Sequence, residues 1–371
     1  MRVLHVYKSY YPDTIGGIEQ VIAQLATALR DSGDESRIFT LSPDAQPRVL
    51  RRPEGEVHRR RAWVEIASNP ISLSAFAEFR RQVEWADVVH YQFPWPFADL
   101  LHLACGRGKP SVVTYQSDVV RQKWLMHAYN PLMKRFLRSV DAVVATSPQY
   151  RDSSPVLQAL GRDVEVIPNG IDETCFPSPG AHTLAAWRES VGEGFFLFVG
   201  VLRYYKGLET LLRAARGFGG RIVIAGTGPQ ADQLQDYAAR EGLANVSFVG
   251  RVSDEDKMAL LRLARAFVFP SHLRAEAFGM SLVEAAMSAL PLVCCEIGTG
   301  TSLVNEAGVT GATVPAQDPD ALRAAMQRLL DDPAQAVRMG QAARRRFEEL
   351  FTAGHMARAY RQLYERVRAQ P

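Results

Sequence analysis

The chain has 371 residues, of which 47% are hydrophobic and 22% are charged, and its formal net charge is +3. This length is sufficient for two domains of ordinary size, and so small a net charge gives no reason to expect a nucleic-acid partner. The sequence contains no run of about 18 uninterrupted apolar residues, so we expect no membrane-spanning helix.

Short hydrophobic runs that are typical of buried strands alternate with helical patterns along the whole chain. Examples of the helical patterns are residues 18–30 and 208–216. This alternation predicts parallel sheets covered by helices. The predicted strands are residues 3–7, 37–41, 88–91, 111–115, 142–146, 164–167, 195–199, 221–225, 246–249, 266–269 and 292–295.

Eleven strands are too many for one ordinary open sheet, and the sequence offers a natural break. The stretch from Pro168 to Gly180 is rich in proline and glycine, which interrupt regular structure. We therefore predict an α/β protein with two doubly wound, Rossmann-like domains that face a cleft. The first covers residues 1–175 together with a helix in 351–371 that crosses back to it, and the second covers residues 176–350.

Glycines and polar side chains follow several predicted strands of the first domain. Gly16 and Gly17 follow the first strand, where they could approach a ligand or simply open the next helix, with Glu19 interacting with its dipole. We predict that His90 ends its strand, and Gln116 and Asp118 follow the next one. These side chains are expected at the ligand-binding edge of the sheet, although a single histidine is as readily explained by packing.

The first domain also carries a basic stretch. Six arginines lie between Arg48 and Arg61, beside Trp63, and further cations follow at Arg121, Lys123, Lys134, Arg135 and Arg138. Such a surface could contact the anionic lipids of a membrane, or it could be a solvated surface loop. No recognised nucleic-acid-binding module accompanies these charges, so we expect no nucleic-acid partner.

In the second domain, two cations follow the first predicted strand. Arg203 and Lys206 lie in the loop after Gly200, where fixed positive charges could neutralise a departing diphosphate. The alternative is a solvated basic loop. The glycine turn at Gly226 and the cation at Arg251 follow the next two strands, and Arg251 could border a nucleotide base.

The most informative pattern is a pair of carboxylates, Glu276 and Glu284. They flank Phe278, Gly279 and Met280, whose backbone N–H groups would open a helix directly after a buried strand. A helix N-terminus in this position can bind a phosphate, while Glu284 could reach a ribose and Glu276 the group attached to the phosphate. An ordinary amphipathic helix would also account for the pattern.

We expect no metal site. Asp254, Glu255 and Asp256 resemble a short metal-binding pattern, but Ser253 before them identifies the stretch as a helix start with acids in its first turn. The four cysteines, Cys105, Cys175, Cys294 and Cys295, lack zinc spacing. With no signal peptide visible, they indicate a reduced cytoplasmic protein.

Taken in order, these motifs resemble the retaining glycosyltransferases of family four, which have the GT-B fold. The likeness covers nearly the whole chain. The segments Tyr115 to Lys123 and Gly298 to Ser302 are similar to mannosyl- and rhamnosyltransferases of bacterial surface polysaccharides, including O-antigens. The motifs that carry the resemblance are Gly16-Gly17-x-Glu19, Pro168-Asn-Gly-Ile-Asp172, Lys206-Gly207, Gly226-Thr-Gly228 and Glu276-x7-Glu284.

The resemblance implies an acceptor-binding first domain and a nucleotide-sugar-binding second domain. It assigns Lys206 and an arginine to the diphosphate, Glu276 to the donor sugar and Glu284 to the ribose. The remaining donor-site residues that it implies are Gly17, Phe278, Gly279, Met280, Gly226, Thr299, Gly300 and Thr301, and Arg251 is added to the predicted donor site because of its position after a strand. It also implies a lipid-linked or other glycan acceptor, no cofactor or metal, and peripheral contact with the inner face of the cytoplasmic membrane.

Two positions depart from the family pattern. Val201 stands where an arginine is common, and Arg203 could replace it. Gln116 stands where a histidine is common, and an amide can hydrogen-bond a hydroxyl but cannot carry a proton. Two alternatives therefore stay open, namely a nucleotide-sugar 2-epimerase and a non-catalytic nucleotide-binding partner in a synthesis complex.

Overall fold

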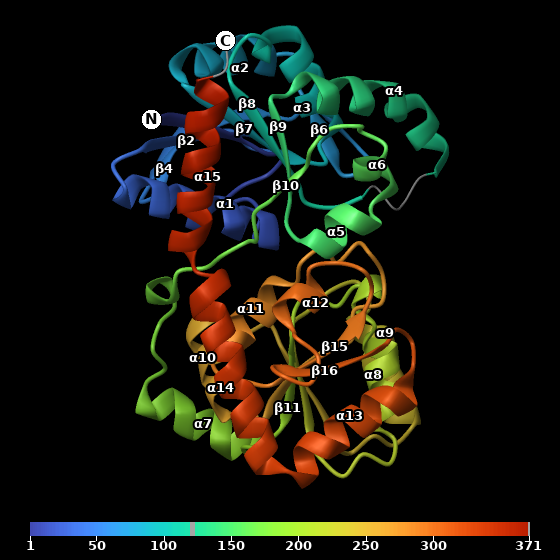
Figure 1. Cartoon of the computed structure of the whole chain (residues 1–371). Helices are drawn as coiled ribbons and strands as arrows, with labels where there is room; N and C mark the ends of the chain where they lie inside the picture. Colours follow the sequence, from blue (N-terminus) through green and yellow to red (C-terminus); the bar gives the residue numbers. More distant parts are fainter. Residues whose placement is uncertain (119–122, 370–371) are drawn as a thin grey trace. The chain divides into compact units, whose positions relative to one another are not determined.

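The computed structural model describes residues 1–118 and 123–369. The chain divides into two compact units, each described here by itself (Figure 1). Unit 1 comprises Met1–Gly170 together with Ala353–Pro371, and unit 2 comprises Ile171–Thr352. The prediction of two α/β units is confirmed, and so is the return of the C-terminal helix to the first of them.

Unit 1 is built on an eight-stranded sheet of order β10-β9-β8-β7-β1-β2-β4-β3. All neighbouring strands are parallel except the hairpin of β3 and β4. The order reverses at β1, so the loop after β1 lies where parallel sheets usually bind ligands. The strands are β1 (Arg2–Val6), β2 (Glu35–Ser42), β3 (Val49–Arg52), β4 (Gly55–Arg61), β7 (Val88–Phe93), β8 (Ser111–Tyr115), β9 (Ala142–Ala145) and β10 (Glu165–Val166).

A separate two-stranded hairpin, β5 (Val64–Ile66) and β6 (Asn69–Ile71), follows β4. The arginine-rich strands β3 and β4 and this hairpin were not predicted, because their side chains lack the hydrophobic pattern of a buried strand. The helices of unit 1 are α1 (Gly17–Asp31), α2 (Ala75–Trp85), α3 (Pro96–Leu101), α4 (Lys123–Ser139), α5 (Pro148–Ser153), α6 (Pro155–Gln158) and α15 (Ala353–Arg368), with a π-helical turn at His102–Gly106.

The C-terminal helix α15, red in Figure 1, is part of the core of unit 1. One face of α15 is buried and packs beside α1. Two of its tyrosines also make polar contacts inside the unit. The Tyr360 hydroxyl lies 2.6 Å from Oγ1 of Thr114, and the Tyr364 hydroxyl lies 2.7 Å from Nδ1 of His90. The interior of unit 1 therefore includes residues from the C-terminal helix.

Unit 2 has a six-stranded sheet of order β13-β12-β11-β14-β15-β16, parallel throughout. Its strands are β11 (Phe196–Val199), β12 (Ile222–Ala225), β13 (Val246–Gly250), β14 (Ala266–Phe269), β15 (Leu292–Glu296) and β16 (Gly311–Pro315). Its helices are α7 (Ala181–Val191), α8 (Leu208–Ala215), α9 (Ala231–Arg240), α10 (Asp254–Leu263), α11 (Met280–Met287), α12 (Thr301–Val304), α13 (Pro319–Asp331) and α14 (Pro333–Leu350).

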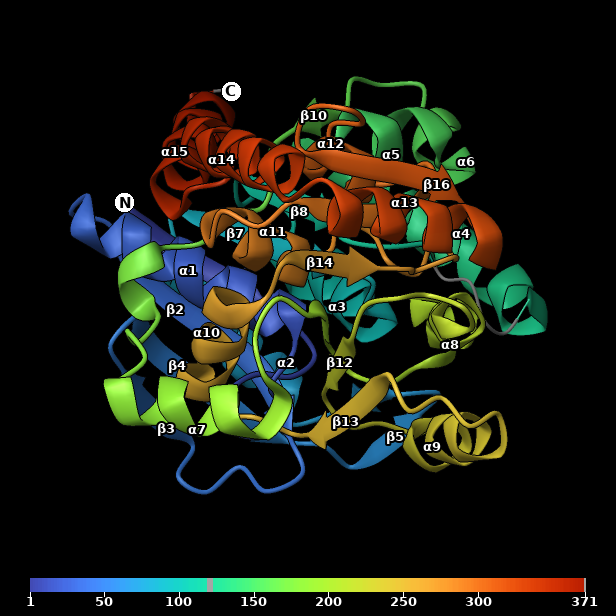
Figure 2. The same cartoon turned by 90° about the horizontal axis from the view of Figure 1, so that it is seen from below.

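The acidic triplet that begins α10 has a capping role. Ser253 Oγ accepts a hydrogen bond from the Asp256 backbone N–H at 3.1 Å, and the Asp256 carboxylate accepts one from the Ser253 backbone N–H at 3.3 Å. This reciprocal capping box confirms the predicted helix start. The Asp256 carboxylate also accepts from the Trp187 ring at 2.8 Å, which fastens α10 to α7, its neighbour in Figure 2.

The described residues give two further structural findings. None of their helices is long and apolar enough to cross a membrane. Among the same residues, no group of three or more His, Cys, Asp or Glu side chains is placed to hold a metal ion.

Three buried histidines of unit 1 predict a dependence of stability on pH. Burial lowers the pKa of His5 to about 3. Burial, with a smaller electrostatic effect of His5, also holds the pKa of His90 well below its ordinary value. Burial, with a smaller effect of Arg107, lowers the pKa of His102 to about 4. In the unfolded chain each imidazole takes up a proton near pH 6.5. The contribution of these histidines to the free energy of unfolding is therefore fully present above that pH and is lost as the pH falls below it.

We expect each histidine to remove about 2 kcal/mol from the free energy of unfolding between pH 7 and pH 5. Urea titrations at the two pH values, followed by tryptophan fluorescence, would measure this loss. The variant His90→Gln has no imidazole to protonate and should lose about 2 kcal/mol less than the parent. An identical loss in parent and variant would contradict the assignment.

Candidate active site

The sheet of unit 2 reverses its strand order between β11 and β14, which are adjacent and parallel. In open parallel sheets, ligands bind beyond the carboxyl ends of the strands at such a point. The loop after β11 carries Arg203 and Lys206, and the loop after β14 carries Glu276. Two candidates in one loop and a third that is 70 residues from Lys206 thus follow the two strands that flank the reversal.

Lys206 and Glu276 form an ion pair in which Nζ donates to Oε2, and each residue is only 9% exposed. The hydroxyl of Ser271 lies 3.4 Å from the same carboxylate oxygen. The Lys206 ammonium also lies 4.5 Å from the ring centroid of Phe269. Because a buried charge is costly without its partner, each residue of this pair requires the other for as long as no ligand is bound.

Gly207 explains how the two loops come so close. Its backbone is left-handed, with φ 69°, and a Cβ atom there would lie 1.9 Å from the Pro270 carbonyl oxygen. The His272 backbone N–H donates to the Tyr205 carbonyl at 3.0 Å and joins the same two loops. A side chain at position 207 would force these loops apart, so the Lys-Gly motif combines a charged group with the backbone approach that positions it.

His272 is a site residue that the sequence did not reveal. Its Nδ1 is buried without a hydrogen-bond partner among the described residues, and burial lowers the pKa of the ring against an opposing effect of Glu209. It neighbours Ser271 and lies in the loop that leads to Glu276. A lone histidine in a loop gives no sequence signal, and only the pairing of the two loops places it here.

The glycine turn after β12 packs on the loop after β11. A Cβ atom on Gly226 would lie 1.9 Å from the Gly200 carbonyl oxygen, and one on Gly228 would lie 2.6 Å from backbone atoms of Leu202. This motif therefore has a packing explanation.

Arg203 and Arg251 are both exposed, and neither side chain has an ion-pair partner in the described part of the chain.

Glu284 is buried in α11, where it pairs with a residue that sequence reasoning missed. Lys257 Nζ lies 3.0 Å from its Oε1 and 3.1 Å from the Asp254 carboxylate. Burial acts to lower the pKa of Lys257, but the two carboxylates outweigh it and hold the pKa above its ordinary value. Lys257 follows the capping box of α10 and belongs to no motif, so no local pattern could connect it with Glu284.

The loop between β14 and α11 packs against the loop between β15 and α12. Gly279 is the N-cap of α11, with φ 87°, and Met280 is its first helical residue. The Gly300 N–H donates to the Ala277 carbonyl at 2.8 Å, and a Cβ atom on Gly300 would lie 2.4 Å from the buried Phe278 ring. This contact places Gly300 directly beside the start of α11.

Thr299 and Thr301, on either side of Gly300, were also predicted at the donor site. Their side chains are buried, with their hydroxyls 3.4 Å apart. Both residues are almost completely buried, so neither hydroxyl is presented at the protein surface.

In unit 1, the glycine pair opens α1 after the first strand. Gly16 is the N-cap and Gly17 is the first, exposed residue of the helix. Glu19 turns back towards this end, where its Oε1 accepts hydrogen bonds from Ser9 at 2.9 Å and Thr14 at 2.7 Å. A Cβ atom on Gly16 would lie 2.5 Å from the Glu19 carboxylate. The glutamate therefore fastens the loop after β1, and it needs Gly16 to do so.

The predicted position of His90 is wrong. It is the third of six residues in β7 rather than the last, and its side chain is completely buried. The strand is longer than predicted because Gln92, although polar, is itself buried within it. His90 thus lies in the interior, against α15, and not at the edge of the sheet.

A chain of buried hydrogen bonds links His90 to Gln116. Gln116 Nε2 donates to the side-chain oxygen Oε1 of Gln92 at 2.8 Å, and the side-chain nitrogen Nε2 of Gln92 lies 3.3 Å from His90 Nε2. An amide nitrogen can only donate, so His90 Nε2 is the acceptor in this contact. The same atom lies 2.7 Å from Thr114 Oγ1, and His90 Nδ1 lies 2.7 Å from the Tyr364 hydroxyl. A path of polar contacts therefore joins Tyr364 of α15 to Gln116 through His90 and Gln92.

Asp118 is two residues beyond Gln116 and is the last described residue of the first segment. Its Oδ1 accepts from the Tyr115 hydroxyl at 3.0 Å and the Ser154 hydroxyl at 2.8 Å, and its N–H donates to the Tyr150 hydroxyl at 2.6 Å. Arg121 and the other residues of 119–122, which contribute to the predicted subgroup motif and basic surface, lie outside the described residues.

Comparison with known proteins places both units in one enzyme class. The family model described as "Glycosyltransferase Family 4" matches residues 15–174, and "Glycosyl transferases group 1" matches residues 184–346. D-rhamnosyltransferase WbpZ of Pseudomonas aeruginosa is 51% identical over 95% of this chain and 93% of its own. O-antigen chain mannosyltransferase C of Escherichia coli is 48% identical over 98% of each chain.

Solved structures show the same fold. A sucrose-phosphate synthase from Thermosynechococcus elongatus superimposes with a TM-score of 0.81 at 23% identity, over 99% of this chain and 98% of the other. Anabaena HepE in complex with UDP does so with a TM-score of 0.80 at 18% identity, over 99% and 100%. The chain belongs to glycosyltransferase family four, has the GT-B fold and is a glycosyltransferase.

The buried ion pair leads to a prediction about stability. Lys206→Met and Glu276→Gln should each lower the free energy of unfolding by about 3 kcal/mol, because each leaves one buried charge or polar group unpaired. The double variant should lose much less than the sum of the two. Urea titration of the parent and the three variants at pH 7 would measure this coupling.

A matched control for this cycle is the pair Arg213–Glu209 on α8, whose side chains are 56% and 60% exposed. Its coupling should be below about 1 kcal/mol. Strictly additive losses at Lys206 and Glu276 would show that the two charges do not depend on each other.

Proposed function

We propose that this glycosyltransferase moves a hexose from a nucleotide diphosphate sugar to a glycan or lipid-linked oligosaccharide, with retention of anomeric configuration and without a metal. The observation that carries the proposal is the buried Lys206–Glu276 pair at the strand-order reversal of unit 2. A cation fixed beside a carboxylate, in a protein of this family, suits a substrate that joins a diphosphate to a sugar.

In this mechanism, the bond between the anomeric carbon and the diphosphate breaks while the acceptor oxygen forms its bond on the same face. The β-phosphate oxygen takes the proton of the acceptor hydroxyl. Lys206, Arg203 and the N-terminal amides of α11 stabilise the negative charge of the departing diphosphate. Glu276 holds the donor sugar, and Glu284 the ribose. The enzyme acts by position and electrostatics and forms no covalent intermediate.

The relatives guide the choice of sugar and pathway. One is named a D-rhamnosyltransferase and another an O-antigen chain mannosyltransferase. We infer a GDP-linked donor of rhamnose or mannose and an acceptor that belongs to a surface polysaccharide such as an O-antigen. Unit 2 would bind the donor, and unit 1 would bind the acceptor near Gln116 and Asp118. The protein would act in the cytoplasm, in peripheral contact with the membrane that carries a lipid-linked acceptor.

Binding of the nucleotide can be tested by thermal shift with GDP, UDP, ADP, dTDP and CMP, each beside its common sugar conjugates. A ligand at 100 times its dissociation constant stabilises the protein by about 2.7 kcal/mol. We expect a selective shift with GDP and GDP-mannose that is lost in Glu284→Ala. The absence of a shift with every nucleotide would refute the donor site.

Turnover tests the role of Glu276. With GDP-mannose or GDP-rhamnose and a lipid-linked acceptor, Glu276→Ala should lose about a hundredfold or more in rate, while Arg213→Ala on the exposed face of α8 keeps the parent rate. Near-normal turnover in Glu276→Ala would overturn the assignment. Conversion of the donor without any acceptor would instead identify a 2-epimerase.

Metal dependence is measured in the same assay. Activity in excess EDTA should equal that of the untreated enzyme. Loss of activity that is rescued by Mn²⁺ would refute the metal-free mechanism.

A further inference from the structure

The arginines of the basic stretch fall into two groups. Arg59 is buried, with its guanidinium 2.8 Å from the Asp13 carboxylate, and Arg52 lies 2.6 Å from Glu54. Arg48 and Arg61, by contrast, are exposed, and their side chains have no hydrogen-bond or ion-pair partner in the described part of the chain. The stretch is therefore not one uniform basic surface, and its uncompensated charge is concentrated at two positions.

These two arginines line a surface pocket of about 510 Å³. Arg60 and Arg81 line it as well, together with Ser74, the N-cap of α2, and Asp44. The walls thus present four guanidinium groups and one carboxylate. A pocket with this excess of positive charge is suited to an anion with several oxygen atoms, because guanidinium groups bind phosphate in a bidentate manner.

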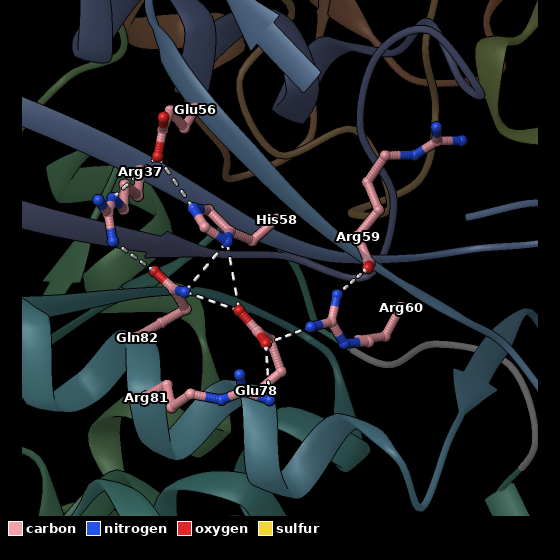
Figure 3. A network of polar contacts seen from close by, with 8 residues as sticks. All are labelled: Arg37, Glu56, His58, Arg59, Arg60, Glu78, Arg81 and Gln82. Atoms are coloured by element: carbon pink, nitrogen blue, oxygen red, sulfur yellow. Dashed lines mark hydrogen bonds and ion pairs between the residues drawn. The ribbon is translucent and has the colours of Figure 1, made fainter. Parts of the chain in front are cut away.

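A buried carboxylate holds two of the four arginines in place, as Figure 3 shows. Glu78 of α2 accepts from Arg60, and the Arg81 guanidinium lies 3.4 Å away. Its other oxygen lies 2.7 Å from Gln82 Nε2 and 3.3 Å from His58. One negative charge is thereby shared by two cations, so Arg60, Arg81 and Glu78 together carry a net positive charge, which Asp44 offsets and which Arg48 and Arg61 restore.

The pocket adjoins exposed apolar side chains. Residues 62–73, which include the hairpin β5–β6, connect Arg61 to Ser74, and both of these residues line the pocket. Several large apolar side chains of this segment are exposed, namely Trp63 at 60%, Val64 at 50%, Ile66 at 52% and Leu73 at 64%. Exposed apolar side chains on a segment that begins and ends at a charged pocket are typical of a binding surface, and tryptophan is enriched where proteins meet the membrane interface.

We propose that the pocket and the hairpin together bind the surface of an anionic membrane. A lipid phosphate occupies the arginine pocket, and Trp63, Val64, Ile66 and Leu73 enter the region below the headgroups. A soluble anion would satisfy the arginines but would leave the apolar side chains in water, whereas a lipid supplies both partners. This inference deepens the peripheral membrane contact of the proposed function by naming the residues that make it. Membrane binding can be measured without turnover.

The test is co-sedimentation of the full chain with vesicles of phosphatidylcholine, with and without phosphatidylglycerol. The double variant Arg48→Gln/Arg61→Gln should bind anionic vesicles about thirty-fold more weakly, since each cation near such a surface contributes about 1 kcal/mol. Both side chains are exposed and unpaired, so the fold should not change. Trp63→Ser/Ile66→Ser should weaken binding tenfold or more, and added salt should weaken it in the parent.

A matched control is Arg135→Gln/Arg138→Gln on α4, a second exposed basic surface of unit 1. This variant should bind like the parent, and an equal loss would overturn the proposal in favour of a diffuse basic surface. Failure of the parent to bind anionic vesicles would also overturn it. Displacement by inorganic phosphate, together with full binding by Trp63→Ser/Ile66→Ser, would identify a soluble-anion site instead.

The nucleotide thermal shift separates this inference from the proposed function. Vesicle binding without any nucleotide shift would leave the membrane site standing and refute the donor site. A nucleotide shift without vesicle binding would do the opposite.

Discussion

The candidate site of unit 2 depends on one interaction, the pairing of a buried ammonium with a buried carboxylate. Either charge alone would be costly in its surroundings, because a buried ion is stable only when it is paired. Gly207 brings the two loops into contact, and the contact supplies each charge with its counter-charge. In the proposed function, a substrate that carries a diphosphate and a sugar hydroxyl would offer new partners to both groups, so the ion pair would form without substrate and would be replaced when substrate binds.

The same principle applies to the second ion pair of unit 2. Glu284 and Lys257 come from neighbouring helices, and their approach compensates charges that are both largely removed from water. The two carboxylates of the Glu276 and Glu284 pattern are therefore each held by a lysine from another element. The geometry of the pattern is fixed by these lysines as much as by the helix that contains Glu284.

The sequence predicted what local patterns determine. The alternation of strands and helices, the start of α10 and the position of Lys206 and Glu276 in loops that each follow a strand were predicted from short stretches of residues. The adjacency of those two strands was not predicted, because strand order is not a local property. Lys257 and His272 could not be found in this way, because their partners come from distant loops and helices. His90 was misplaced because a polar residue within a strand resembles a strand end unless its buried partners, here Gln92 and Tyr364, are known.

The last helix of the chain completes the unit that the ribosome makes first. His90 and Tyr364 are separated by 274 residues, and the whole of unit 2 is synthesised between them. During translation, unit 2 is a continuous segment that can fold as soon as it emerges. The buried polar residue His90 of β7 has its partner Tyr364 only once α15 has been made. We therefore expect unit 2 to complete its fold before unit 1, and we expect a nascent chain that has not yet reached α15 to be the species most exposed to misfolding.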